Sequence, residues 1–141
     1  MFVACLRTYC GLSIHATTLD PEDITAELGI QPTMVRAKDP SSPYRPRRER
    51  SYWRFEPDKH VSSTDYRDHL QHILDLLVGK EDALESLRHS GCMTRISCFM
   101  DVAGNTEIWL ERPAIAALAK LGLEIWWDVY PESPDEQTET D

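Results

Sequence analysis

The chain lacks an apolar segment long enough to cross a membrane. Hydrophobic residues make up 41% of the 141 residues, but no stretch approaches the ~20 consecutive apolar residues that a spanning helix needs. The N-terminal stretch, MFVACLRTYCGLSIH, also lacks the basic start and the unbroken apolar segment of a signal peptide. We therefore expect no membrane association and a cytoplasmic location.

Sequence motifs that carry catalytic chemistry are also missing. The chain has no GxSxG nucleophile turn, no HExxH metal motif, no P-loop and no glycine-rich dinucleotide turn. Cys10 with His15, or Cys98 with His89, would supply a nucleophile and a base, but nothing in the spacing brings either pair together. The sequence thus offers no catalytic residue and no cofactor, and it does not favour an enzyme.

Cysteines are few, and their spacing suits neither a disulfide framework nor a zinc site. Cys5 and Cys10 are five positions apart, and Cys92 and Cys98 are six apart. Neither pair has the short spacing of a zinc knuckle or of a CxxC redox motif. Cysteines of this kind in a cytoplasmic protein are ordinarily reduced and buried, so we expect separate thiols.

Positive charge is scarce overall but concentrated locally. The 15 Lys and Arg face 24 Asp and Glu, a formal net charge of −9, which opposes binding of nucleic acid by the surface as a whole. Residues 34–54 nevertheless hold seven Lys or Arg against two acids. Residues 131–141 hold five acids and no base, and we expect this acidic tail to be disordered.

Several segments alternate between apolar and other residues with the period of two that indicates a β-strand. The longest of these segments extend from the N-terminus to residue 15, over 94–103 and over 123–130. Shorter strands are expected at 51–55 and 106–110. The residues predicted to face the core in these strands include Leu6, Cys10, Leu12, Ile14, Trp53, Phe55, Ile96, Cys98, Met100, Val102, Leu123, Ile125, Trp127 and Val129.

Helices are predicted between these strands. Asp20, Pro21 and Gly29 are residue types that begin and end a short helix over 21–28. Three further helices are expected at 65–79, 80–91 and 113–121. Residues 31–50 contain four prolines and no periodicity, which predicts a long Pro- and Arg-rich loop.

The order of these elements predicts an α+β domain. Alternating strands present one face to the core and the other to solvent or a partner, whereas parallel strands buried on both faces have continuous apolar runs. We therefore expect a single two-layer α+β sandwich over residues 1–130, whose mostly antiparallel sheet of four or five strands has helices packed on one face. No internal repeat or domain boundary is evident.

Parts of this pattern resemble a known family. The segment GLSIHATTLDPEDITAELGIQPT, the strand centred on Trp53, HLQHILDLL and LAKLGLEIWWDVY are similar to the small bacterial proteins of domain-of-unknown-function family 4279. The likeness covers nearly all of the chain except the acidic tail. It departs at Lys38 and Asp39, where the family often has Lys-Gly. The resemblance implies a small bacterial α+β domain and supplies no activity, substrate or catalytic residue.

The strand faces opposite the predicted core are rich in aromatic residues and arginine. The residues expected to form a binding surface there are Arg7, Tyr9, Tyr52, Arg54, Arg95, Phe99, Trp126 and Tyr130, with His15 beside them. Exposed aromatic patches usually mark a contact surface, so the sequence predicts a non-catalytic interaction module that binds a protein partner or a second copy of itself. Two alternatives stay open: the 31–50 loop covers this face, or a one-residue change of register buries it.

Nucleic acid is a disfavoured occupant of the same face, because Asp101, Glu124 and Asp128 are expected on it and would repel phosphate. A small anion or nucleotide bound by residues 36–54 is the alternative function. Its candidate ligands are Arg45, Arg47 and Arg48, since guanidinium groups suit phosphate and carboxylate. The competing interpretation is that the arginines of this segment pair with the protein's own acids.

A metal site has weak support. His69 and His72 are three positions apart on a predicted helix, a spacing that can place two ligands on one face. The apolar residues of that helix define a different, buried side. We therefore expect the two histidines to be solvated and no metal to be bound.

Overall fold

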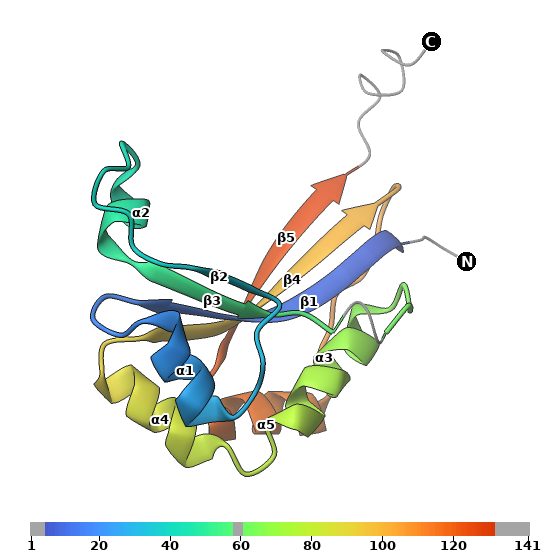
Figure 1. The fold of residues 1–141 in the computed structure, drawn as a ribbon. Coiled ribbons are helices and arrows are strands. Elements are labelled where there is room, and N and C mark those ends of the chain that lie inside the picture. The colour runs from blue at the N-terminus through green and yellow to red at the C-terminus, as the bar shows by residue number, and fades with distance from the viewer. Residues whose placement is uncertain (1–4, 58–60, 132–141) are drawn as a thin grey trace.

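A computed structural model describes residues 5–57 and 61–131 of the chain, and Figure 1 shows the fold. The strands are β1 (Cys5–Ala16), β2 (Met34–Arg36), β3 (Ser51–Phe55), β4 (Met93–Val102) and β5 (Glu124–Pro131). The helices are α1 (Pro21–Leu28), α2 (Arg45–Glu49), α3 (Tyr66–Leu76), α4 (Glu81–His89) and α5 (Arg112–Leu121). The predicted acidic tail lies outside the described residues except for Pro131, which ends β5.

The strands form one sheet in the order β2-β3-β1-β4-β5. β1 pairs antiparallel with both β3 and β4, and β2 pairs antiparallel with β3. β5 lies parallel to β4, because α5 carries the chain back from the end of β4 to the start of β5. The mostly antiparallel sheet of an α+β domain is thus confirmed, with one parallel pair at its edge.

Four helices, α1, α3, α4 and α5, lie together on one face of the sheet (Figure 1). They bury the apolar side of the strands, where Leu12, Trp53 and Ile96 are completely covered. Ile73 of α3 and Leu84 of α4 are buried against them. None of the helices in the described part of the chain is long and apolar enough to cross a membrane.

Local sequence explains where α1 begins and ends. The Asp23 carboxylate accepts a hydrogen bond from the backbone N–H of Asp20 at 2.9 Å, and Pro21 opens the helix. Gly29 follows the last turn with φ of 69°, a conformation that is strained for residues with a Cβ. Trp53 then fixes the helix to the sheet, because its Nε1 donates to the Thr25 hydroxyl at 2.9 Å.

The segment predicted as a long loop, residues 31–50, contains regular structure instead. Met34–Arg36 forms β2 beside β3, at the edge of the sheet. α2 follows and lies above the sheet in Figure 1, away from the other four helices. A three-residue strand is too short to show alternation, which is why the sequence did not reveal it. The segment widens the sheet and leaves Trp126 and Tyr130 about half exposed, so it does not cover that part of the face.

Three other expectations are wrong. Val129, expected in the core, is 41% exposed near the end of edge strand β5. Residues 106–110, expected as a strand, have no regular secondary structure. Leu6, expected in the core, is 52% exposed, because the register of β1 against β4 shifts between Cys5 and Arg7. A bulge moves one residue to the other face of a sheet, and the apolar pattern of a single strand cannot place it.

The cysteines also differ from the expectation of four separate thiols. Cys10 and Cys98 are opposite one another in the β1–β4 pair, with Cα atoms 4.2 Å apart, and form a disulfide. Cys5 and Cys92 are free. The bonded residues are separated by 88 positions, so only the strand register brings them together. A disulfide is more typical of oxidising compartments than of the cytoplasm, and the cytoplasmic location stays a prediction.

Candidate binding surface

The sheet has one face that α1, α3, α4 and α5 do not cover, and we call it the open face. The side chains that the sequence predicts for a binding surface lie on it, in rows set by the strand register. Tyr9 of β1 is opposite Phe99 of β4, and His15 of β1 is opposite Tyr52 of β3. Arg36 of β2 continues the second row beside Tyr52. The rows bring together residues that are far apart in the sequence.

Three rings and one arginine meet at one end of the open face. Tyr9 and Phe99 stack with ring centroids 4.9 Å apart and planes at 15°, and Phe99 meets Tyr130 at 5.2 Å. The Arg7 guanidinium lies 5.4 Å from the Tyr9 ring centroid and 5.7 Å from that of Phe99. We call Arg7, Tyr9, Phe99 and Tyr130 the aromatic cluster. Tyr130 is 55% exposed, so part of this cluster is open to contact.

The centre of the open face is polar and largely closed by internal contacts. Arg54 donates to the Glu56 carboxylate at 2.7 Å and to the Ser13 hydroxyl, and its side chain is only 11% exposed. A Cβ at Gly11 would lie 2.5 Å from Cζ of Arg54, so the bare backbone of β1 makes room for the guanidinium. Arg54 therefore pairs with an acid of the protein itself, as the competing interpretation of these arginines expects.

At the other end of the open face, three arginines from different segments act electrostatically on His15. Nη2 of Arg95 lies 3.3 Å from Nε2 of His15. The rings of His15 and Tyr52 are 4.8 Å apart, and the Arg36 guanidinium lies 5.2 Å from the Tyr52 ring centroid. Burial, together with the positive charges of Arg95, Arg50 and Arg36, lowers the pKa of His15 to about 4. We call Arg36, Arg50 and Arg95 the arginine cluster.

Trp126 is the most exposed tryptophan of the open face, at 53%. Cζ of Arg95 lies 4.0 Å from its ring centroid, and its Nε1 donates to the Glu124 carboxylate at 2.9 Å. Both contacts fix the plane of the indole. A fixed, half-exposed aromatic plane loses little conformational entropy when it is covered, so Trp126 is suited to contact a partner.

The three arginines predicted to bind an anion are mostly engaged elsewhere. They lie on α2 and just outside the arginine cluster. Nε of Arg45 donates to the Glu49 carboxylate at 2.6 Å, and Arg48 donates to two backbone carbonyls of the preceding turn at 3.1 Å. Nε of Arg47 is buried and has no acceptor among the described residues. The sequence identified the basic segment but not the arginines that converge.

The weak metal candidates do not form a site. His69 is 1% exposed, and its Nε2 lies 2.8 Å from the Ser63 carbonyl oxygen, so the expectation that it is solvated is wrong. His72, on the next turn of α3, is half-buried. Across residues 5–57 and 61–131, no group of three or more His, Cys, Asp or Glu is placed to hold a metal ion.

A cavity of about 570 Å³ lies at the start of β1, beside the N-terminus of α3 and the segment that leads to α5. No pattern in the sequence indicates this cavity, because its walls come from three distant segments. Its lining includes Cys5, Thr64, Asp65, Tyr66, Arg67, Met100, Asn105, Thr106, Glu107 and Trp109.

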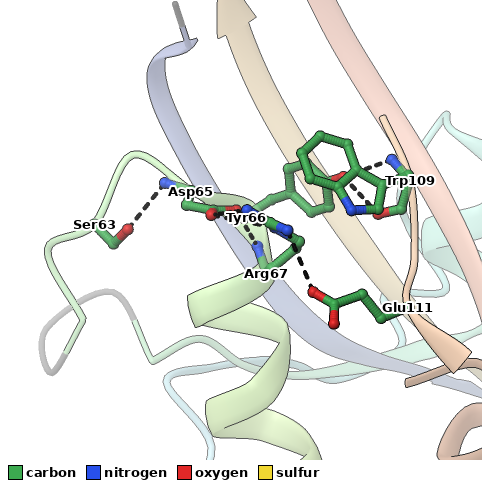
Figure 2. A network of polar contacts seen from close by, with 6 residues as sticks. All are labelled: Ser63, Asp65, Tyr66, Arg67, Trp109 and Glu111. Atoms are coloured by element: carbon green, nitrogen blue, oxygen red, sulfur yellow. Dashed lines mark hydrogen bonds and ion pairs between the residues drawn. The ribbon is translucent and has the colours of Figure 1, made fainter. Parts of the chain in front are cut away.

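Figure 2 shows the polar network beside this cavity. The Tyr66 hydroxyl donates to the Trp109 carbonyl at 2.5 Å and accepts from the Trp109 N–H at 2.6 Å. Arg67 lies between Asp65, at 2.6 Å, and Glu111, at 3.3 Å, and 4.1 Å from the Trp109 ring centroid. The donors and acceptors of this network form hydrogen bonds and ion pairs with one another. The network therefore holds the segment before α5 against α3.

The titratable groups at the cavity do not have the properties of a nucleophile. Burial raises the pKa of the Cys5 thiol and of the Tyr66 hydroxyl, so both stay protonated at neutral pH. Reactive thiols instead have a lowered pKa and a nearby cation or base. The arrangement favours a structural contact over covalent chemistry.

These features define a class: a single α+β domain with an open sheet face that carries an aromatic cluster and an arginine cluster. The family model described as "Domain of unknown function (DUF4279)" matches residues 7–132. The chain belongs to this family, and the resemblance seen in the sequence is confirmed. No curated protein and no solved structure matches the chain.

Proposed function

We propose that the protein is a non-catalytic interaction module that binds a second copy of itself through the aromatic cluster and the free edge of β5. The observation that carries the proposal is the position of the cluster. Tyr130 belongs both to the cluster and to β5, and it is 55% exposed. An exposed aromatic patch that continues onto a strand edge with no partner in the described part of the chain is a typical contact surface.

The edge of β5 supports this choice of partner. β5 has eight residues and is hydrogen-bonded on one side, to β4, within the described part of the chain. Trp126, Val129 and Tyr130 are 53%, 41% and 55% exposed. β5 contains no lysine, the residue that most often protects an edge strand from pairing. Two copies of β5 that pair antiparallel about a two-fold axis would continue the sheet and satisfy the free backbone groups.

Charge does not prevent such a contact. The net charge of −9 repels a second copy at long range, but salt screens exposed charges beyond ~8 Å at physiological ionic strength. At the contact itself, Arg7 lies against the rings of the aromatic cluster. Burial of the rings supplies the favourable free energy, since aromatic side chains dominate the energetics of most interfaces.

Analytical ultracentrifugation over a range of protein concentrations tests the proposal. We expect a species of twice the 16.2 kDa chain mass that dissociates on dilution. Replacing both Trp126 and Tyr130 with Ser removes two exposed rings from the open face and should give a monomer, and Val129→Lys should weaken the dimer through the strand edge.

The matched control is Ile115→Ser. Ile115 is 51% exposed on α5, on the opposite side of the sheet, so its replacement should leave the dimer unchanged. A monomer at every concentration would reject self-association and leave a different protein as the partner of the open face. A dimer that survives all the β5 variants would show that another surface mediates it.

A further inference from the structure

The described part of the chain places no carboxylate in direct contact with the arginine cluster. Ion pairs in the described part of the chain engage Arg45, Arg54 and Arg67. In the same part of the chain no carboxylate lies within 4 Å of the guanidinium groups of the arginine cluster, although the chain carries 24 acids. The acid opposite Arg95 in the β4–β5 register is Glu124, and it accepts from Trp126 instead.

We propose that the arginine cluster, together with His15 and Tyr52, binds a small oxyanion, a phosphate or carboxylate group carried by a small molecule. The site lies where β1, β2, β3 and β4 meet the end of α2, and it is separate from the aromatic cluster. The proposal goes beyond self-association, because it assigns a ligand to the other end of the open face and does not require a dimer.

Aromatic rings hold two of the three guanidinium groups in place. Arg36 lies over the Tyr52 ring and Arg95 over the Trp126 ring, at 5.2 and 4.0 Å from the centroids. A guanidinium that stacks by its face keeps its N–H edges free to donate, and these edges match the two oxygens of a phosphate or carboxylate. The stacks therefore order the donors before a ligand arrives, which lowers the entropy lost on binding.

His15 adds a donor without adding charge. A guanidinium has no acceptor atom, so at the 3.3 Å contact Nη2 of Arg95 donates and Nε2 of His15 accepts. The imidazole is then neutral with its proton on Nδ1, in agreement with the pKa of about 4. Nε of Arg95 is buried and has no acceptor among the described residues, which shows that the guanidinium is held here without full satisfaction of its donors.

An ordinary solvated surface is the competing explanation, since Arg36 and Arg50 are exposed. The contacts of Arg95 argue against it, because its Nη2 donates to His15, its guanidinium lies over Trp126 and its Nε is buried without an acceptor among the described residues. Solvated arginines extend away from one another, because like charges repel. Here the electrostatic effect of three arginines reaches one imidazole, although they come from β2, from the residue after α2 and from β4. A bound oxyanion would reverse the repulsion that this arrangement imposes.

Titration of the full chain with inorganic phosphate at pH 7 and constant ionic strength tests the proposal. The readout is the NMR signal of the His15 imidazole, with sodium chloride as the reference salt. We expect a saturable shift, and we expect phosphate to raise the pKa of His15 from about 4, because an anion favours the imidazolium. Replacing Arg36 or Arg95 with Gln should weaken binding about tenfold or more, as loss of a hydrogen bond to a charged group does.

Arg45→Gln is the matched control, since Arg45 is on neighbouring α2 and pairs with Glu49; binding should be unchanged. Arg36 is exposed on an edge strand, so its variant keeps the test valid if Arg95→Gln fails to fold.

Citrate in place of phosphate distinguishes a carboxylate ligand from a phosphate ligand. If neither anion shifts His15 more than chloride does, or if Arg45→Gln weakens binding as much as Arg36→Gln, the proposal is wrong. Tyr130→Ser and Val129→Lys test self-association without removing the Trp126 ring that holds Arg95, whereas Arg36→Gln tests only the anion site.

Discussion

The two ends of the open face are built on the same strands with opposite chemistry. β1 and β4 supply Tyr9 and Phe99 to the aromatic cluster, and His15 with Arg95 at the other end. In the aromatic cluster the rings attract one another and stabilise the fold as they stand. In the arginine cluster, three positive charges act on one neutral imidazole, and rings hold two of the guanidinium groups.

This difference explains which kind of ligand or partner would stabilise each end. The aromatic cluster is satisfied internally and gains only from burial of the ring area that remains exposed. The arginine cluster has no carboxylate within 4 Å in the described part of the chain, so an anion would add a direct counter-charge. A single sheet face can therefore carry a surface suited to a protein and a separate site suited to a small ligand.

Loss of the Cys10–Cys98 disulfide should weaken both ends together, and it is the largest effect that we expect. The bond joins β1 to β4, the two strands common to both clusters, and closes a loop of 88 residues. Such a cross-link contributes roughly 2–5 kcal/mol to the free energy of unfolding. Urea unfolding of the oxidised protein and of the reduced, alkylated protein measures the difference.

Alkylation of the unreduced, denatured chain tests whether the Cys10–Cys98 disulfide is present. Only Cys5 and Cys92 should be labelled, and labelling of all four cysteines would contradict the disulfide. Equal stability before and after reduction would show that strand pairing alone holds β1 to β4.

Acid should destabilise the protein through His15, the titratable group at the arginine end of the open face. The pKa of His15 falls from its usual 6.5 to about 4 in the folded protein, so between these pH values the unfolded chain binds a proton that the folded chain does not. Stability must therefore fall as the pH decreases from 6.5 to 4. Carboxylates also destabilise the fold in acid, so the informative quantity is the difference between the protein and His15→Gln.

That variant should lose stability less steeply over the same pH range. Arg36→Gln should raise the pKa of His15, measured by NMR, and Arg45→Gln should leave it unchanged. A His15 pKa near 6.5 in the unmodified protein would mean that the arginines do not act on the imidazole as the structure indicates.

Double-mutant cycles should give the smallest effects and the sharpest contrast between the two ends. Replacing Tyr9 and Phe99 singly and together with Leu should reveal a coupling of about 0.5–1.5 kcal/mol, the usual range for a stacked pair. Arg95→Met with Trp126→Leu should give about 0.5–1 kcal/mol, as for an exposed cation–π pair.

Salt separates the two couplings. In 1 M sodium chloride the coupling of Arg95 with Trp126 should decrease, because that contact is electrostatic and the Debye length is then only ~3 Å. The coupling of Tyr9 with Phe99 should persist. Equal salt dependence of both would contradict the distinction between the clusters.

Much of the fold follows from short-range patterns. Alternation predicted which side chains of β4 are buried, and Ile96, Cys98, Met100 and Val102 are each at most 2% exposed. Asp20, Pro21 and Gly29 marked the ends of α1. Patterns of this kind depend on neighbours along the chain, so one sequence contains them. The exposure of Leu6 escaped prediction because the bulge in β1 depends on its partner strand.

The candidate surface was predicted as a set of residues but not as an arrangement. Alternation placed Tyr9, Phe99 and Trp126 on the face away from the core, where the structure has them. The convergence of Arg36, Arg50 and Arg95 on His15 was not predicted. It depends on β2, a strand too short to recognise, and on the order of the strands in the sheet.

The sequence by itself determined the α+β class, most of the buried stripe of the long strands and the supply of aromatic and arginine side chains for the opposite stripe. Tertiary structure alone decided which of these side chains meet, which cysteines bond and which arginines lack a nearby carboxylate among the described residues. The physical reason is that periodicity is a property of adjacent residues, whereas strand register and strand order depend on the free energy of the whole packed sheet.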